Sequence, residues 1–144
     1  MFCPAKEFAA ADTVLIAAPH RDLSFPAALK AYIEAVNVAG IAFRYSPEGL
    51  PIGLCKASRL YYISTAGGPV TAPVYGYGYV EAMAKTFWGI PDVYCVQADG
   101  LDIVGADVEG ILSAAEKRSA RCPYKENMER FLSKCSCNRS FLML

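Results

Sequence analysis

Residues 13–24 read TVLIAAPHRDLS, and this stretch decides which fold class the chain can adopt. Its first six residues form a continuous apolar run, without the alternation expected of a strand that has one solvent-exposed face. Such a run is typical of a strand covered on both faces, as in parallel α/β sheets. Polar residues follow at once, so the strand ends in a loop that is either a plain connector or part of a ligand site.

A helix is predicted directly after this loop. Its apolar residues recur at helical spacing and Gly40 supplies a stop, so we expect it to end before that glycine. Asp22 or Ser24 can cap its start, and Pro26 suits its first turn. The residues expected on its buried face are Leu29, Tyr32, Ile33 and Val36.

The rest of the chain repeats the strand and helix alternation after one interruption. Prolines and glycines in residues 41–56 predict a long irregular loop or a small hairpin. Strands are then predicted at residues 59–64 and 93–98, and helices at residues 79–88 and 106–118. The predicted fold class is therefore α/β, a parallel sheet of about three strands with flanking helices. The last of these helices should bury Val108, Ile111, Leu112 and Ala115.

Composition excludes several classes of function. Fourteen basic and 14 acidic residues balance, which gives no electrostatic case for a nucleic acid or an anionic membrane as partner. The apolar runs are strand-sized, and the first residues do not form a signal peptide, so we expect a cytoplasmic protein with reduced thiols. No metal site is expected, because Cys122, Cys135 and Cys137 lack a fourth ligand at zinc-site spacing.

Two loops stand out as candidate ligand sites. Residues 19–24 and 64–69 both follow predicted strands, and ligands of parallel sheets bind at the carboxyl ends of strands. Gly67 and Gly68 allow a flat ligand to approach the backbone closely, although an ordinary turn explains them equally well. His20 is the only histidine, and no nucleophile motif lies near it, so a hydrolytic triad is not indicated. Asp22 fits a helix cap better than a catalytic acid.

Four blocks of the sequence together resemble a known family. They are AAPHRDLSFPAALKAYIE (17–34), GIAFRYSPEGLPIGLCKA (40–57), STAGGP (64–69) and FWGIPDVYCVQADGLDIVG (87–105). These blocks are similar to the FMN-dependent NAD(P)H:quinone oxidoreductases with a flavodoxin-like fold, the azoreductase group. The similarity runs from about residue 8 to residue 115.

The resemblance implies a set of cofactor-binding residues and an activity. One loop would hold one side of the FMN ring, and the second would bind its polar edge through backbone groups. The family passes a hydride from NADH or NADPH to the flavin, then two electrons to a quinone or azo compound. It works as a homodimer, without an essential side-chain acid or base, and the cofactor performs the chemistry. The implied residues are Pro19, His20, Arg21, Asp22 and Leu23 in the first loop and Thr65, Ala66, Gly67 and Gly68 in the second.

Two departures from the family pattern shape the expected function. His20 and Arg21 stand where the family carries an aromatic residue in the first loop. The family also begins with a further strand–helix–strand unit whose Ser-rich loop holds the FMN phosphate. We expect this chain to lack that unit, to leave an open sheet edge at residues 13–18, and to bind FMN weakly or not at all.

These departures keep three interpretations open. The chain is a truncated FMN-dependent oxidoreductase, a non-catalytic remnant or interaction module, or a subunit completed by another chain. We expect residues 1–120 to form the partial flavodoxin-like domain. Residues 121–144 would form a helical extension or tail, with Met128, Phe131 and Leu132 at helical spacing.

Overall fold

The computed structural model describes residues 4–121 and 141–143. η1 is a 3-10 helix and η2 is a π-helix. In chain order the elements are α1 (Pro4–Ala10), β1 (Thr13–Ala17), α2 (Ala27–Val36), β2 (Phe43–Tyr45), β3 (Pro51–Gly53), β4 (Arg59–Thr65), η1 (Pro73–Tyr75), α3 (Tyr77–Met83), η2 (Ala84–Trp88), β5 (Asp92–Ala98), α4 (Val108–Arg121) and β6 (Phe141–Met143).

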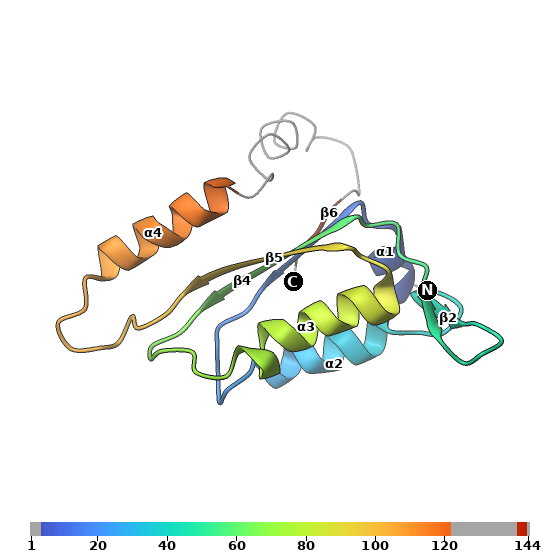
Figure 1. Cartoon of the computed structure of the whole chain (residues 1–144), viewed down its shortest axis with the longest axis horizontal. Coiled ribbons are helices and arrows are strands. Elements are labelled where there is room, and N and C mark those ends of the chain that lie inside the picture. Colours follow the sequence, from blue (N-terminus) through green and yellow to red (C-terminus); the bar gives the residue numbers. More distant parts are fainter. Residues whose placement is uncertain (1–3, 122–140, 144) are drawn as a thin grey trace.

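The main sheet is parallel throughout and has the strand order β5-β4-β1-β6 (Figure 1). β1, β4 and β5 are the three predicted strands, so the predicted α/β class with a parallel sheet and flanking helices is confirmed. In register, Thr13 pairs with Arg59, which pairs in turn with Asp92. The short strand β6 adds a fourth member on the other side of β1 and pairs with Thr13–Leu15, so the expected open edge at residues 13–18 is wrong for this part of the strand.

One face of the sheet carries the main core. α2 and α3 lie on this face, and α4 lies on the opposite side (Figure 1). Alternate residues of the strands point toward α2 and α3, and Val14, Ile16 and Leu60 are fully buried there. Leu15 points the other way and is also buried, which explains why residues 13–18 are apolar without alternation.

α2 was predicted correctly in position but not in its cap. Leu29, Ile33 and Val36 are buried, as the helical spacing required. The N-cap is Pro26, and no side chain hydrogen-bonds to the helix start, so the predicted capping by Asp22 or Ser24 is wrong. The physical reason is a separate turn at residues 21–24, which closes on itself before the helix begins.

α4 forms over the predicted segment but buries less than expected. Ala115 is buried, whereas Val108 and Leu112 are 39% and 40% exposed, so the predicted burial of these two is wrong. α4 packs mainly on β5, which is the edge strand of the sheet. Part of the apolar stripe of the helix therefore extends past the sheet.

Residues 41–56 contain a hairpin rather than an irregular loop. β2 and β3 pair antiparallel, and the backbone of Gly53 lies against the end of the π-helix η2. A Cβ atom on Gly53 would lie 2.1 Å from the backbone nitrogen of Gly89. Gly89 has a φ of 72° and ends the helix, as predicted. Only glycine fits this approach of two backbones.

α1 is an element that the sequence reasoning did not predict. Its Phe8 is buried and packs edge-on against Trp88, with ring centroids 4.6 Å apart. The indole nitrogen of Trp88 donates a hydrogen bond to the side-chain oxygen of Asn37 at 3.1 Å. α1, α2 and η2 are therefore joined through one buried tryptophan.

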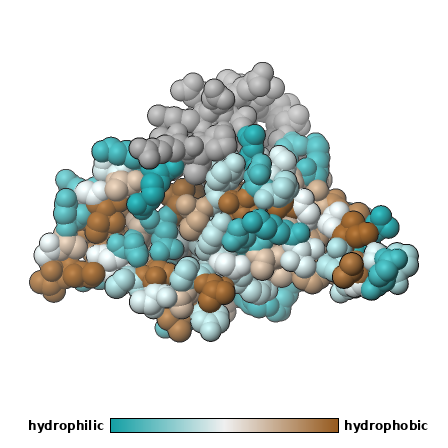
Figure 2. Space-filling model, in the orientation of Figure 1, coloured by the Kyte–Doolittle hydropathy of each residue, from teal (hydrophilic) through white to brown (hydrophobic). Residues whose placement is uncertain are grey.

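Several predictions lie outside the described residues. These are the helical spacing at Met128, Phe131 and Leu132 and the group of Cys122, Cys135 and Cys137. The domain division at residue 120 stays a prediction, although β6 falls within the segment expected to be a tail. Among the described helices, none is long and apolar enough to cross a membrane. Apolar side chains on the face shown in Figure 2 are scattered among hydrophilic ones.

Candidate functional site

The two candidate loops lie side by side at the carboxyl ends of β1 and β4. Hydrogen bonding continues past the end of β1, because the Ala18 N–H donates to the Ile63 carbonyl at 3.0 Å. The His20 N–H then donates to the Thr65 carbonyl at 2.7 Å. The structure thus brings Pro19 to Leu23 and Thr65 to Gly68 together, as expected for neighbouring parallel strands.

The first loop contains a tight two-residue turn. Arg21 and Ser24 exchange two backbone hydrogen bonds, of 2.9 and 2.8 Å. The two central residues have positive φ, 49° at Asp22 and 69° at Leu23. This is the pattern of a type I′ turn, which strongly favours Asn-Gly or Asp-Gly. A leucine in this conformation is strained, and strain of this kind is concentrated at functional sites.

The turn also presents Leu23 to solvent and is tied to a second segment. The Leu23 side chain is 53% exposed although it is large and apolar. Directly after it, the Ser24 hydroxyl donates a hydrogen bond to the Tyr75 carbonyl at 2.6 Å. The first loop is therefore held between β1 and η1, and its apolar tip is available to a ligand.

The second loop is clamped from behind by the segment after β5. The N–H groups of Gly100, Leu101 and Asp102 donate to the carbonyls of the loop at 2.9 to 3.2 Å. Their acceptors are Gly68, Ala66 and Gly67 respectively. The carbonyl oxygens of Ala66, Gly67 and Gly68 are therefore all engaged by the segment after β5.

Two N–H groups of the second loop remain available. Those of Gly67 and Gly68 donate to no other residue in the described part of the chain. A Cβ on Gly67 would lie 2.1 Å from a carboxylate oxygen of Asp102, so this position has no room for a side chain. At Gly68 the same Cβ would meet nothing within 4 Å, so the backbone there faces open space. Free amide donors beside open space fit the acceptor-rich edge of a flat heterocycle.

Polar side chains lie beneath the two loops. The Nδ1 atom of His20 and the hydroxyl of Tyr62 both lie within 4 Å of the Cβ position on Gly76. The hydroxyls of Tyr62 and Ser64 are buried and make no hydrogen bond of ordinary geometry among the described residues. Burial raises the pKa of Tyr62, and the nearby Ser64 hydroxyl partly offsets this rise. Tyr62 is therefore a neutral phenol at physiological pH.

Some residues of the site were not named from the sequence. The clamp at residues 100–102 and the partner segment at Tyr75 and Gly76 belong to the same edge of the sheet. The sequence feature that could have identified the clamp is its position directly after the strand predicted at residues 93–98, which corresponds to β5. No comparable sequence signal marked Tyr75, because it lies between the strand predicted at residues 59–64 and the helix predicted at residues 79–88.

Comparison with known families gives a match over most of the chain. The model of a family described by its flavodoxin-like fold matches residues 4–121. An FMN-dependent NADH:quinone oxidoreductase from Clostridium acetobutylicum is 45% identical over 112 residues, which are 75% of this chain and 56% of that protein. A second protein of that name, from Clostridium perfringens, is 43% identical over 107 residues, 73% of this chain and 53% of the relative.

Solved structures agree with this similarity. An azoreductase from Bacillus anthracis str. Sterne superposes with a TM-score of 0.71 at 29% identity, covering 81% of this chain and 58% of that one. An FMN-dependent NADH-azoreductase from Bacillus anthracis str. Ames Ancestor, in complex with FMN, gives a TM-score of 0.69 at 27% identity over 81% and 57%. This chain spans a little over half the length of the curated relatives it matches.

Proposed function

Because the chain belongs to the family with the flavodoxin-like fold, we propose that it is an FMN-dependent NAD(P)H oxidoreductase that reduces quinones or azo compounds. The observation that carries this proposal is the second loop, with two free amide donors and open space at Gly68. The names of its relatives, and the FMN in one similar structure, support the choice of flavin over other flat ligands.

FMN, when bound, takes up a hydride from the nicotinamide and passes two electrons to the acceptor. In sum, NAD(P)H, a quinone and one proton give NAD(P)⁺ and a hydroquinone. Complete cleavage of an azo bond to two amines takes two NAD(P)H and two protons. The hydride supplies one of the two hydrogens that the quinone gains. The other is a proton taken from solvent, because the site is at the surface.

The residues of this chain would position the ring rather than perform acid–base chemistry. We expect the amides of Gly67 and Gly68 to bind its polar edge. Leu23, at the tip of the first turn, would pack against one face of the ring. Arg21 stands where the family has an aromatic residue and would stack its guanidinium on the ring or pair with an acidic substrate. This set supplies no partner for the FMN phosphate, and we therefore expect weak FMN binding by the isolated chain.

The proposal includes how the chain works in the cell. We place it in the cytoplasm, where NAD(P)H is available and the thiols stay reduced. It acts as a homodimer or is completed by another chain that pairs with the open part of β1. Among the described residues, Ile16 and Ala17 pair with β4 on one side and with no strand on the other, which supports such pairing.

A titration with FMN tests the proposal. We expect the fluorescence of FMN to be quenched by the full chain, with a dissociation constant in the micromolar range or weaker, and NADH to be oxidised when menadione is added. In Gly68→Val the added side chain has room to fold but blocks the approach of the ring, so FMN binding should weaken at least tenfold. Ala114→Val, at an exposed position of α4, is the matched control.

The alternative function makes the opposite prediction. If saturating FMN changes neither its own fluorescence nor the melting temperature of the protein, the chain is not a flavoenzyme by itself. The non-catalytic interaction module would then be the better interpretation. Equal FMN binding by Gly68→Val and wild type would contradict the placement of the ring at the second loop.

A further inference from the structure

Two buried hydroxyl groups lie beneath the two loops of the candidate site. Tyr62 and Ser64 are 1% and 4% exposed, and both come from the carboxyl half of β4. Neither hydroxyl makes a hydrogen bond of ordinary geometry within the described part of the chain, although the two lie near each other. Buried hydroxyls are almost always hydrogen-bonded to a protein atom or to an ordered water, because leaving one unpaired costs free energy. These two side chains therefore point to a further polar partner.

Three polar atoms from three separate segments lie around one point at Gly76. The Cβ position of this glycine would be 3.8 Å from Nδ1 of His20, 3.9 Å from the Tyr62 hydroxyl and 4.0 Å from the Pro73 carbonyl oxygen. The Tyr62 hydroxyl is hydrogen-bonded to neither of the other two atoms. Polar atoms that converge in this way without bonding directly are typical of a place where a water molecule bridges them.

We propose that one ordered water molecule is bound at this point, held by Tyr62, His20 and Pro73. The neutral Tyr62 phenol donates its proton to the water, and its oxygen accepts the proton of the nearby Ser64 hydroxyl. The water donates one hydrogen to Nδ1 of neutral His20 and the other to the Pro73 carbonyl. That carbonyl already accepts the Gly76 N–H at 3.1 Å, but its second lone pair can accept another bond. A buried water typically makes about three hydrogen bonds, which these partners supply, and both buried hydroxyls are then satisfied.

Gly76 leaves room for this water because it has no side chain. A Cβ atom at residue 76 would have the same three polar atoms as its nearest neighbours, so any side chain here would compete with the water for the same space. A methyl group in that space would also leave the Tyr62 hydroxyl buried without a partner. The glycine is therefore part of the water site, together with the groups that bind the water.

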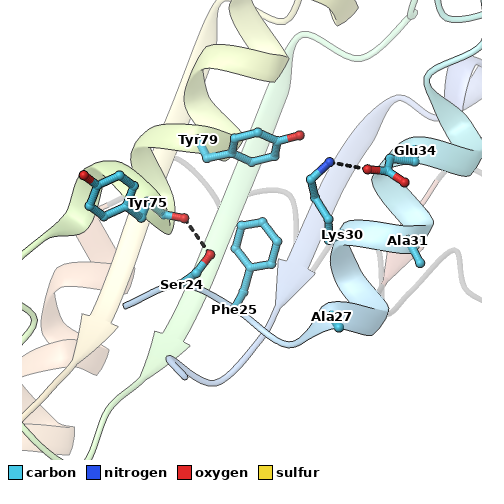
Figure 3. Close-up of a pocket in the computed structure, with 8 residues that line it drawn as sticks. All are labelled: Ser24, Phe25, Ala27, Lys30, Ala31, Glu34, Tyr75 and Tyr79. Atoms are coloured by element: carbon cyan, nitrogen blue, oxygen red, sulfur yellow. Dashed lines mark hydrogen bonds and ion pairs between the residues drawn. The ribbon is translucent and has the colours of Figure 1, made fainter. Parts of the chain in front are cut away.

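The water links both loops of the candidate site to η1. His20 belongs to the first loop, Tyr62 lies on the strand that carries the second, and Pro73 begins η1. A direct contact also joins the first loop to η1. Figure 3 shows the Ser24 hydroxyl donating to the Tyr75 carbonyl, at 2.6 Å, beside the pocket between α2 and the η1–α3 segment. The water is bound in the absence of flavin and NAD(P)H, so its detection does not depend on the proposed function.

The sign of one stability change tests the water site. Tyr62→Phe removes the hydroxyl and keeps the ring in the core. If a water satisfies this hydroxyl, the variant loses a hydrogen bond, and we expect its melting temperature to fall by about 3 °C. If the hydroxyl has no partner, its removal leaves the melting temperature unchanged or raises it, and the proposal is overturned. Tyr77→Phe is the matched control, because the Tyr77 hydroxyl donates to the Val93 carbonyl at 3.3 Å and its loss lowers the melting temperature without involving a water.

A double-mutant cycle shows whether His20 and Tyr62 share the water. His20→Phe keeps an aromatic ring and removes both ring nitrogens. If one water joins the two side chains, losing either partner weakens the bond to the other, so the double variant should melt only slightly below the less stable single variant. Additive losses would contradict a shared water, whereas His20→Phe combined with Tyr77→Phe is the control and should be additive. A high-resolution crystal structure of the full chain gives the direct measurement. We expect an ordered water within hydrogen-bond distance of the Tyr62 hydroxyl and of Nδ1 of His20, and a structure without it would overturn the proposal.

Discussion

At the scale of single residues, the turn of the first loop adopts a strained backbone conformation that lowers the stability of the fold. Asp22 and Leu23 both have positive φ, and Leu23 has neither the freedom of glycine nor the local hydrogen bonding of asparagine. Its side chain is exposed, so little packing repays the strain. A residue that is both strained and exposed is explained best by a ligand that covers it.

Replacing this leucine should therefore stabilise the protein. We expect Leu23→Gly to raise the free energy of unfolding by about 1 kcal/mol, because glycine adopts positive φ without a steric penalty. Urea denaturation measures the change. Leu50→Gly is the control, since Leu50 is 64% exposed and does not have positive φ. It should lose stability, and a similar loss in Leu23→Gly would show that the turn is unstrained.

At the scale of elements, the hairpin of β2 and β3 fixes where the π-helix η2 ends. Gly53 and Gly89 bring two backbones into contact, and the Cys55 N–H donates to the Trp88 carbonyl at 3.3 Å. The same tryptophan is packed against α1 and hydrogen-bonded to Asn37. These contacts hold the end of η2, and with it the helix α3 that precedes it, against α1, α2 and the hairpin.

A methyl group at this contact should be destabilising. In Gly53→Ala the new Cβ would meet backbone atoms that no rotamer change can move, so we expect a loss of about 1–3 kcal/mol. Thermal melting and urea denaturation report it. Gly68→Ala provides the comparison, because its Cβ meets nothing within 4 Å and its φ is not left-handed. Equal stability of the two variants would mean that the hairpin moves away from η2 without penalty.

At the scale of the whole molecule, buried phenols make the folded state sensitive to alkali. Burial raises the pKa of Tyr77 to about 12, and the nearby Glu81 adds to the rise. Its hydroxyl donates a hydrogen bond to the Val93 carbonyl at 3.3 Å, which joins α3 to β5. Burial also raises the pKa of Tyr62 and of Tyr32.

The sign of the effect on stability follows from these pKa values. An unfolded chain loses the tyrosine proton near pH 10, whereas folded Tyr77 keeps it to about pH 12. Stability should therefore fall as the pH rises from 10 to 12. Tyr77→Phe should be less stable at pH 8, by about 1 kcal/mol for the lost hydrogen bond, but the difference from wild type should shrink above pH 10. Melting temperatures measured across this range would contradict the prediction if the difference stays constant.

Much of the fold was predictable because its strands are buried on both faces. Residues 13–18 and 60–63 are apolar without alternation, which is typical of a strand covered on both faces. α1 was missed because a seven-residue helix carries too little periodicity to be recognised. The burial of α4 was overestimated, since helical spacing predicts which face is apolar and not how much of the sheet lies under it.

The candidate site was predictable only in part, for topological reasons. Both loops follow strands, and carboxyl ends of adjacent parallel strands meet at one edge, so their proximity could be expected. The turn at Asp22 and Leu23 could not, because leucine stands at the second position of the turn, where glycine is favoured. The pocket between α2 and the η1–α3 segment, which includes Lys30 and Tyr75, is formed by residues far apart in the sequence. No local pattern in either segment predicts that the two lie side by side.

The pairing of β6 with β1 has a consequence for the order of folding. Thr13 pairs with Arg59 on one side and with Phe141 on the other, so the second contact closes a much larger loop of chain. Loop-closure entropy rises with the logarithm of loop length, and only three residue pairs are gained in return. The β1–β4 pair is therefore expected to form before the β1–β6 pair, and β6 is expected to leave the sheet before β1 and β4 separate.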